Sequence, residues 1–103
     1  MIIIRQNHYT VQAAYAAQNQ KQISQVMEEL RSLRRTDIRY SVFVEDDEKT
    51  FLHLLFCASE EAEQVFFRLA SQQAFQAGLV GSHLEVPPTM TTFRLVGAAS
   101  DRL

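Results

Sequence analysis

The chain has 103 residues, which is the length of a single domain with a modest core. Hydrophobic residues make up 47% of the chain and charged residues 21%, a balance that excludes a disordered chain and is typical of a folded domain. The net charge of −2, with both signs interspersed, argues against a surface that binds nucleic-acid phosphates.

Cysteine usage and the distribution of apolar residues bear on the compartment. Cys57 is the single cysteine and cannot form a disulfide within the chain, which is typical of an intracellular protein, so we expect a cytoplasmic location. The opening MIII is too short for the apolar region of a signal peptide. No run approaches the roughly 20 apolar residues of a membrane span, so no membrane contact is expected.

The first third of the chain predicts a strand and a long helix. Residues 1–11 begin with β-branched side chains and then alternate, as a strand does. Residues 13–35 lack Gly and Pro and are rich in good helix formers. Their apolar residues recur at steps of three and four and predict an amphipathic helix ending near Arg35: Ile23, Val26, Met27, Leu30 and Leu33.

A hairpin and a second helix are predicted next. Residues 37–57 form two extended runs around the acidic tip EDDEK, which has the chemistry of a turn. Ser59 offers a helix N-cap with glutamates close behind it. The apolar stripe beyond this cap predicts one helix that continues to Gly78 or Gly81.

The end of the chain completes the order of elements. Pro87 and Pro88 are expected to form only an extended approach, because proline cannot donate to a strand ladder. The last strand is therefore predicted at residues 89–98, and the tail after it is expected to fray. The whole chain, residues 1–103, is interpreted as one domain with the order β-α-β-β-α-β.

This order predicts an α+β domain of the ferredoxin-like kind, with a four-stranded antiparallel sheet. Right-handed crossovers place both helices on one face of that sheet. The strands at residues 1–11 and 50–57 are then central, and they are also the most apolar strands of the chain.

The run FLHLLFC at residues 51–57 is apolar on both faces. Two helices cover only one face of four strands, and leaving Leu52, Leu54 and Phe56 in water would forgo roughly 1.5–3 kcal/mol for each side chain. An exposed patch of this size usually marks an interface. We therefore predict a homodimer that pairs sheet face to sheet face about a twofold axis. The sequence leaves open which face of this strand looks at the helices.

Several stretches in succession carry a resemblance to a known family: HYTV, QNQKQI, RYSVF, FLHL, AFQAG and PP…FRLVG. In this order and at this length, the chain resembles the dimeric α+β barrel superfamily, in particular the domains similar to antibiotic biosynthesis monooxygenases. The resemblance implies a small homodimer with a pocket between the helices and the concave sheet of one subunit. Members of the superfamily include cofactor-independent oxygenases acting on phenols and quinols, haem-degrading oxygenases, and relatives of unknown activity.

His53 is the leading catalytic candidate, because an imidazole among apolar neighbours can stay neutral and act as a base near neutral pH. The competing interpretation is a core histidine with a structural hydrogen bond. The other catalytic candidates are polar residues that can stabilise a developing oxyanion: Asn7, Asn19 and Tyr40. Aromatic residues are the candidates for binding the substrate: Tyr9, Tyr15, Phe66 and Phe75.

Haem and metal chemistry find less support in the residues. Haem-degrading relatives use an asparagine at a similar place to Asn7, together with a tryptophan and a histidine, but this chain has no tryptophan. His8 and His83 are isolated from each other and from Cys57, and the acidic tip lacks the spaced ligands and glycine of a calcium loop. We expect no metal and no cofactor.

Three hypotheses about function follow. The first is a cofactor-independent monooxygenase acting on a small aromatic or quinol substrate, in which His53 ionises the substrate so that it can pass an electron to oxygen. The second is a non-catalytic dimer of the same fold that binds a small hydrophobic molecule or another protein. The third is an isomerase or dehydratase that uses His53 for proton transfer.

Overall fold

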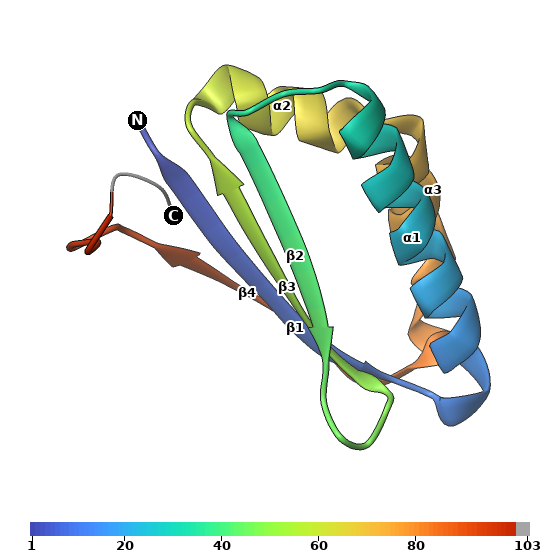
Figure 1. Cartoon of the computed structure of the whole chain (residues 1–103). Helices are drawn as coiled ribbons and strands as arrows, with labels where there is room; N and C mark the ends of the chain where they lie inside the picture. The colour runs from blue at the N-terminus through green and yellow to red at the C-terminus, as the bar shows by residue number, and fades with distance from the viewer. Residues whose placement is uncertain (101–103) are drawn as a thin grey trace.

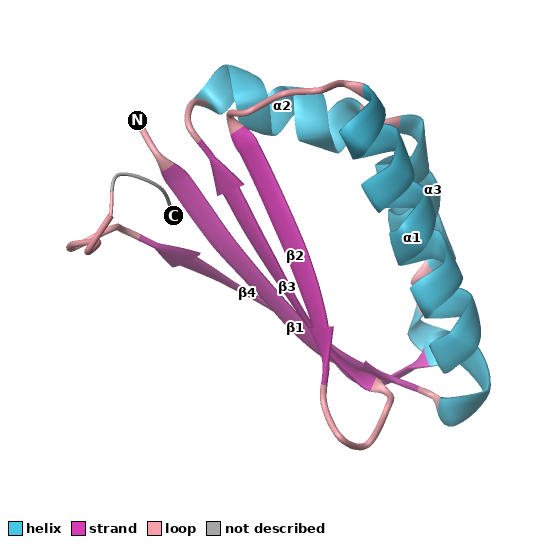
Figure 2. Ribbon diagram, viewed as in Figure 1, coloured by secondary structure: helices cyan, strands magenta, loops and turns pink. Residues whose placement is uncertain are grey.

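The computed structural model describes residues 1–100 of the chain, so the tail expected to fray, residues 100–103, lies outside the described residues except for Ser100. The strands and helices follow one another in the predicted order, except that the second helix is divided, and two short 3-10 turns lie between them (Figure 2). The main elements are β1 (Ile3–Val11), α1 (Ala16–Ser32), β2 (Ile38–Val44), β3 (Thr50–Cys57), α2 (Glu60–Arg68), α3 (Ala70–Gly78) and β4 (Leu84–Phe93).

The four strands form one antiparallel sheet in the order β2-β3-β1-β4, which confirms the predicted ferredoxin-like topology with β1 and β3 in the centre. All helices lie on the same side of this sheet (Figure 1). None of the helices in the described part of the chain has the length and apolar character needed to cross a bilayer.

The predicted second helix is in fact two helices, which corrects the sequence-based expectation. Leu69 leaves the helical conformation with φ −58° and ψ 132°, so that it ends α2 and begins α3. Leucine is a good helix former, and the stretch contains no Gly or Pro, so no local signal marks this break. The turn at Leu69 lets α2 lie across one end of the sheet while α3 runs back beside α1 (Figure 1).

The last strand begins and ends earlier than predicted. β4 contains both Pro87 and Pro88, and it stops before Leu95 and Val96. The prolines are tolerated because β4 is an edge strand and because the pairing of β1 with β4 shifts register between His8 and Thr10, opposite the prolines. A missing backbone donor therefore breaks no regular ladder at this point.

The two faces of the sheet differ in cover, and β3 shows the difference residue by residue. Its side chains at alternate positions are buried under the helices: Phe51, His53, Leu55 and Cys57. The intervening Leu52, Leu54 and Phe56 point to the opposite face, where Leu54 is exposed. The register places Phe43 of β2 beside Leu52, and Phe43 is 55% exposed. His53 therefore lies on the helix-covered inner face, which answers the question that the sequence left open.

Candidate functional site

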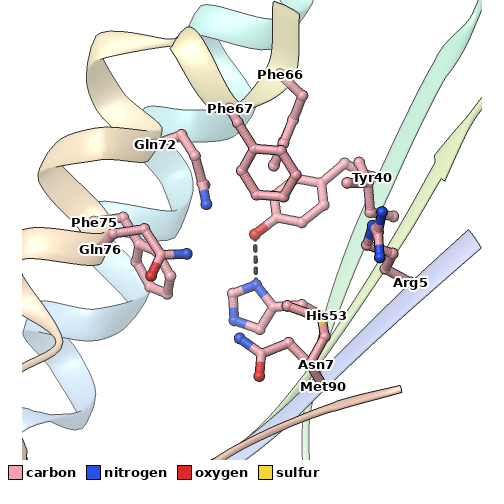
Figure 3. Close-up of a pocket in the computed structure, with 11 residues that line it drawn as sticks. Arg5, Asn7, Tyr40, His53, Phe66, Phe67, Gln72, Phe75, Gln76 and Met90 are labelled. Atoms are coloured by element: carbon pink, nitrogen blue, oxygen red, sulfur yellow. Dashed lines mark hydrogen bonds between the residues drawn. The ribbon is translucent and has the colours of Figure 1, made fainter. Parts of the chain in front are cut away.

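A small cavity lies between the inner face of the sheet and the helices α2 and α3 (Figure 3). Its volume is about 30 Å³, which is room for a water molecule or two and far below the several hundred Å³ of a typical small-molecule site. Sheet residues and helix residues both line it: Arg5, Asn7, Tyr40, His53, Leu55, Phe66, Phe67, Gln72, Phe75, Gln76 and Met90.

Strand register brings the polar sheet residues of the cavity together. His53 of β3 lies directly opposite Asn7 of β1 and Val42 of β2, and Asn7 in turn lies opposite Met90 of β4. Opposite residues of an antiparallel sheet point to the same face, so Asn7, His53 and Met90 share the inner face. Tyr40 reaches the same point from the next inward position of β2 (Figure 3).

A chain of hydrogen bonds runs from the core to this cavity. The Nδ2 atom of Asn19 on α1 donates to the hydroxyl oxygen of Tyr9 at 2.8 Å. The same Tyr9 hydroxyl lies 2.7 Å from Nε2 of His53, and Nδ1 of His53 lies 2.5 Å from the hydroxyl of Tyr40. Both ring nitrogens of His53 are therefore engaged by tyrosines. We call the four residues Asn19, Tyr9, His53 and Tyr40 the relay.

Burial sets the protonation of the relay. Loss of solvation lowers the pKa of His53 to about 4, so the imidazole is neutral at physiological pH. The same cause raises the pKa of both phenols, Tyr9 and Tyr40, well above the ordinary tyrosine value. The relay is thus uncharged near neutral pH and works through its hydrogen bonds.

Two amide side chains meet the cavity with unsatisfied hydrogen-bonding capacity. Gln72 of α3 is buried, and its Oε1 atom has no partner among the described residues. Asn7 of β1 likewise has a buried Oδ1 atom with no partner in that part of the chain. A buried polar atom without a partner is unusual, and a common reason is a ligand or water that completes it. Figure 3 shows Gln72 pointing from α3 toward the Tyr40 and His53 side chains.

A cation closes one side of the cavity. Arg5 of β1 forms a two-pronged ion pair with Glu63 of α2, and it also donates to the hydroxyl of Thr92 at 3.1 Å. Beyond Arg5 lies a wider groove of about 450 Å³ at the N-terminal end of β1. Because Arg5 lines both spaces, its side chain stands between the cavity and this groove.

The structure places the predicted site residues in three groups. Five of them line the cavity: Asn7, Tyr40, His53, Phe66 and Phe75. Tyr9 and Asn19 do not line it but hold His53 from behind. Tyr15 lies elsewhere, where its hydroxyl donates to Gln22 and to the carbonyl of Gly78 and its ring stacks on His83 with centroids 4.0 Å apart.

Sequence reasoning missed Gln72, Gln76 and Met90. Glutamine in a helix and methionine in a strand are ordinary surface or core residues, so neither type carried a signal. The only available indication for Gln72 was its place, three residues before Phe75, on the stripe that faces the sheet. Arg5 was easier to find from the sequence, because it shares one face of the first strand with Asn7.

Other polar groups have structural roles. His8 pairs with Glu45 at 2.9 Å on the exposed side. The acidic tip is organised by Asp47, whose carboxylate accepts hydrogen bonds from the backbone of Lys49 and Thr50. Within residues 1–100, no three His, Cys, Asp or Glu side chains gather as a metal site would require. Burial raises the pKa of the Cys57 thiol to about 11, which makes it unreactive.

Comparison with known proteins defines the class of this fold. No model of a protein family and no curated protein matches the sequence. Solved structures do match: an antibiotic biosynthesis monooxygenase has a TM-score of 0.75 at 12% identity, over 94% of this chain and 100% of that one. PA3566 of Pseudomonas aeruginosa has a TM-score of 0.76 at 10% identity, over 93% and 95% of the two chains.

A third solved structure has a described activity. SnoaB, a cofactor-independent oxygenase from Streptomyces nogalater, has a TM-score of 0.71 at 13% identity, over 95% of this chain and 96% of its own. Identities this low show the fold alone. The chain therefore has the fold of these monooxygenase structures, as the resemblance seen in the sequence implied.

Proposed function

We propose that the protein is a cofactor-independent monooxygenase that acts on a small phenol or quinol bound at the inner cavity. The observation that supports this most is the relay, because it presents one polar hydroxyl, that of Tyr40, to a cavity walled mainly by aromatic and aliphatic side chains. An aromatic substrate fits such walls, and its oxygen finds Tyr40, Asn7 and the cation of Arg5 within the same space. The shared fold with SnoaB agrees with this proposal.

The chemistry that suits this site is stabilisation of an oxyanion. Oxygenation of this kind requires an ionised, electron-rich substrate that passes an electron to oxygen. The site promotes ionisation because donors aimed at the substrate oxygen stabilise its charged form more than its neutral form. Arg5 adds N–H donors on the same side, while its charge is balanced by the ion pair with Glu63.

His53 supports Tyr40 in this scheme and is not itself the strong base of the reaction. Its pKa of about 4 makes it a weak proton acceptor, and both its nitrogens already have tyrosine partners. The substrate proton then leaves to solvent as the bound anion is stabilised. This assignment differs from the role as base that the sequence suggested for His53, and the pH dependence of the rate distinguishes the two. A His53 base would add a limb to the profile, whereas anion stabilisation makes the rate follow the ionisation of the substrate.

The cavity must widen to admit a phenol. Its solvent side is formed by Gln76 and Met90, both exposed, and Met90 lies on the edge strand β4 that the helices leave uncovered. Movement of these two side chains requires no change in the core. The route to the cavity is therefore assigned to the β4 side of the sheet.

The active form is proposed to be a homodimer. The outer face of the sheet presents apolar side chains that no helix covers: Ile4, Phe43, Leu52, Leu54, Phe56 and Phe93. A second copy related by a twofold axis buries the same patch on both chains at once. The likeness to a superfamily of dimers supports this arrangement.

Oxygen consumption with a panel of quinols and hydroxynaphthalenes tests the function. The wild-type protein is expected to consume oxygen with at least one of them, and Tyr40→Phe is expected to slow the rate by roughly 10²-fold, as loss of one oxyanion donor does. Tyr15→Phe is the matched control, because it removes a tyrosine hydroxyl that lies outside the cavity. Equal rates for wild type and Tyr40→Phe, or no uptake with any substrate, would contradict the proposal.

A non-catalytic dimer of the same fold, which binds a small molecule or another protein, is the alternative. The small volume of the cavity favours the interaction with another protein. In either case oxygen is not consumed. Nuclear magnetic resonance titration with the same panel separates the two functions, because it reports binding whether or not a reaction occurs.

A further inference from the structure

The hydrogen bonds of the relay all donate in the same direction along it, and this direction follows from the surroundings of Tyr9. The Tyr9 side chain is 0% exposed, and its hydroxyl has two polar neighbours, Asn19 Nδ2 and His53 Nε2. The amide nitrogen is a donor and cannot accept the Tyr9 hydrogen. In a dry core this hydrogen needs an acceptor, so Tyr9 donates to Nε2 of His53.

The donor assigned at Tyr9 also fixes which atoms donate at His53 and Tyr40. A neutral imidazole carries one hydrogen, and because Nε2 accepts from Tyr9 that hydrogen lies on Nδ1. Nδ1 then donates to the oxygen of Tyr40, 2.5 Å away. The hydrogen of the Tyr40 hydroxyl is left over and points to the cavity, where Figure 3 shows the hydroxyl above the ring of His53. With the Asn19 amide nitrogen toward Tyr9, the opposite order would leave the buried Tyr9 hydrogen without an acceptor. Turning this amide over would bring its unpartnered Oδ1 to Tyr9 and reverse the order, which would place the His53 hydrogen on Nε2.

We propose that the relay fixes Tyr40 as a hydrogen-bond donor toward the cavity, so that the ligand atom bound there is an acceptor oxygen. The chemical class is a phenolate or quinol anion, or the carbonyl of a quinone. This inference rests on the proposed function in that it takes the cavity as the ligand site. Tyr9 is then a positioning residue, which acts on the ligand only through His53 and Tyr40.

The rest of the cavity lining fits the same ligand class. Asn7 and Gln72 each carry an amide with two N–H groups, and neither has a hydrogen-bonded partner for its oxygen in the described residues. Arg5 uses two of its nitrogens on Glu63 and one on Thr92, and its guanidinium still has N–H groups in excess of these bonds. The spare N–H groups of Arg5 and of the two amides can donate to an acceptor oxygen, while the unpartnered amide oxygens of Asn7 and Gln72 require a water or a donor group of the ligand.

The position of the His53 hydrogen tests the direction without any ligand. Long-range nitrogen-15 correlation spectra of histidine-labelled protein at neutral pH report it, with the His53 signals assigned by their loss in His53→Gln. We expect the hydrogen on Nδ1 in the wild type and in Asn19→Leu, which removes the amide without adding an acceptor. Tyr9→Phe is expected to release the constraint and to give a mixture of the two forms. A wild-type hydrogen on Nε2, or a Tyr9→Phe spectrum identical to the wild type, would overturn the inference.

The ionisation of bound 4-nitrophenol tests the ligand class. Its visible absorption distinguishes phenolate from phenol, and we expect its pKa to fall on binding by about one pH unit, the effect of one good hydrogen bond to a charged oxygen. Tyr40→Phe is expected to lose most of this shift. Binding with an unchanged or raised pKa would overturn the ligand class. The two proposals can fail separately. If the His53 hydrogen lies on Nδ1 but neither nitrophenol nor any member of the quinol panel binds, the direction of the relay stands. The proposed function and the assignment of a ligand are then contradicted.

Discussion

The inner and outer faces of the sheet are built from similar apolar residues but are completed differently. On β3, three apolar side chains point inward, Phe51, Leu55 and Cys57, and all three are buried. Between them, Leu52, Leu54 and Phe56 point outward, and these are half-buried or exposed. The inner face is finished by the helices of the same chain, which leave one small polar cavity. The outer face has no such cover, and its apolar side chains call for a partner. The comparison teaches that the candidate site is assembled within one chain, whereas the cover of the outer face is proposed to come from a second copy.

The largest expected effect is on the free energy of unfolding, when one aromatic residue is truncated on each face of the sheet. Phe75→Ala, which removes a buried ring of α3 from above the inner face, is expected to lower the free energy of unfolding by about 3–5 kcal/mol. Phe43→Ala on the outer face is expected to change it by less than about 1 kcal/mol in a dissociated chain, because Phe43 is 55% exposed there. Urea unfolding of both variants, in a Leu54→Glu background that prevents pairing, measures the difference. Similar losses would mean that the two faces are equally buried in one chain.

The next effect is the dependence of stability on pH, which arises from His53 on the inner face. Burial lowers the pKa of His53 in the folded protein to about 4, from an unfolded value of 6.5. Its contribution is therefore fully present above pH 6.5 and is lost as the pH falls from 6.5 toward 4, because the unfolded chain takes up the proton first. The expected loss is about 3 kcal/mol over this range.

Urea unfolding at several pH values checks this, with His53→Gln as the control. The difference between the two curves isolates the histidine, since any carboxylate contributions are common to both proteins. A wild-type protein whose stability is no more dependent on pH than that of His53→Gln would show that His53 is not held neutral by burial.

A smaller effect tests how closely the end of α3 packs against Tyr15 and Gln22. A methyl group at Gly78 would approach the Tyr15 hydroxyl to 2.9 Å and the Gln22 side-chain nitrogen to 2.7 Å, whereas one at Gly81 meets nothing within 4 Å. Gly78→Ala is expected to destabilise by roughly 1–3 kcal/mol. Gly81→Ala is expected to be neutral or to stabilise by less than about 1 kcal/mol. Thermal unfolding of the pair measures both, and equal melting temperatures would contradict the close packing at the end of α3.

Much of the fold was predictable, because it follows from local patterns. Alternation identified β1, two extended runs around an acidic turn identified the β2–β3 hairpin, and the stripe of apolar residues identified α1. Two features were not. The break at Leu69 has no local signal, because the conformation there is imposed by packing of a buried leucine. The early start of β4 was hidden by Pro87 and Pro88, which the edge position and the shifted register accommodate.

The candidate site was predictable as a set of residue types but not as an arrangement. His53, Tyr40 and Asn7 stood out as polar groups on apolar strands, and the cavity lining includes all three. Which tyrosine engages which ring nitrogen depends on strand register and on the placement of α1, and these distances come only from the folded chain. Gln72 depends on the turn at Leu69, so it could not be found without that turn.

The contrast between the two faces depends on whether a second chain shelters the outer one. Sedimentation velocity of the purified protein at micromolar concentration is the most direct measurement, run beside Leu54→Glu on the outer face and Gln73→Glu on the exposed side of α3. Wild type and Gln73→Glu are predicted to sediment as two chains, and Leu54→Glu as one folded chain. A wild-type protein that sediments as a single, fully folded chain would contradict the account.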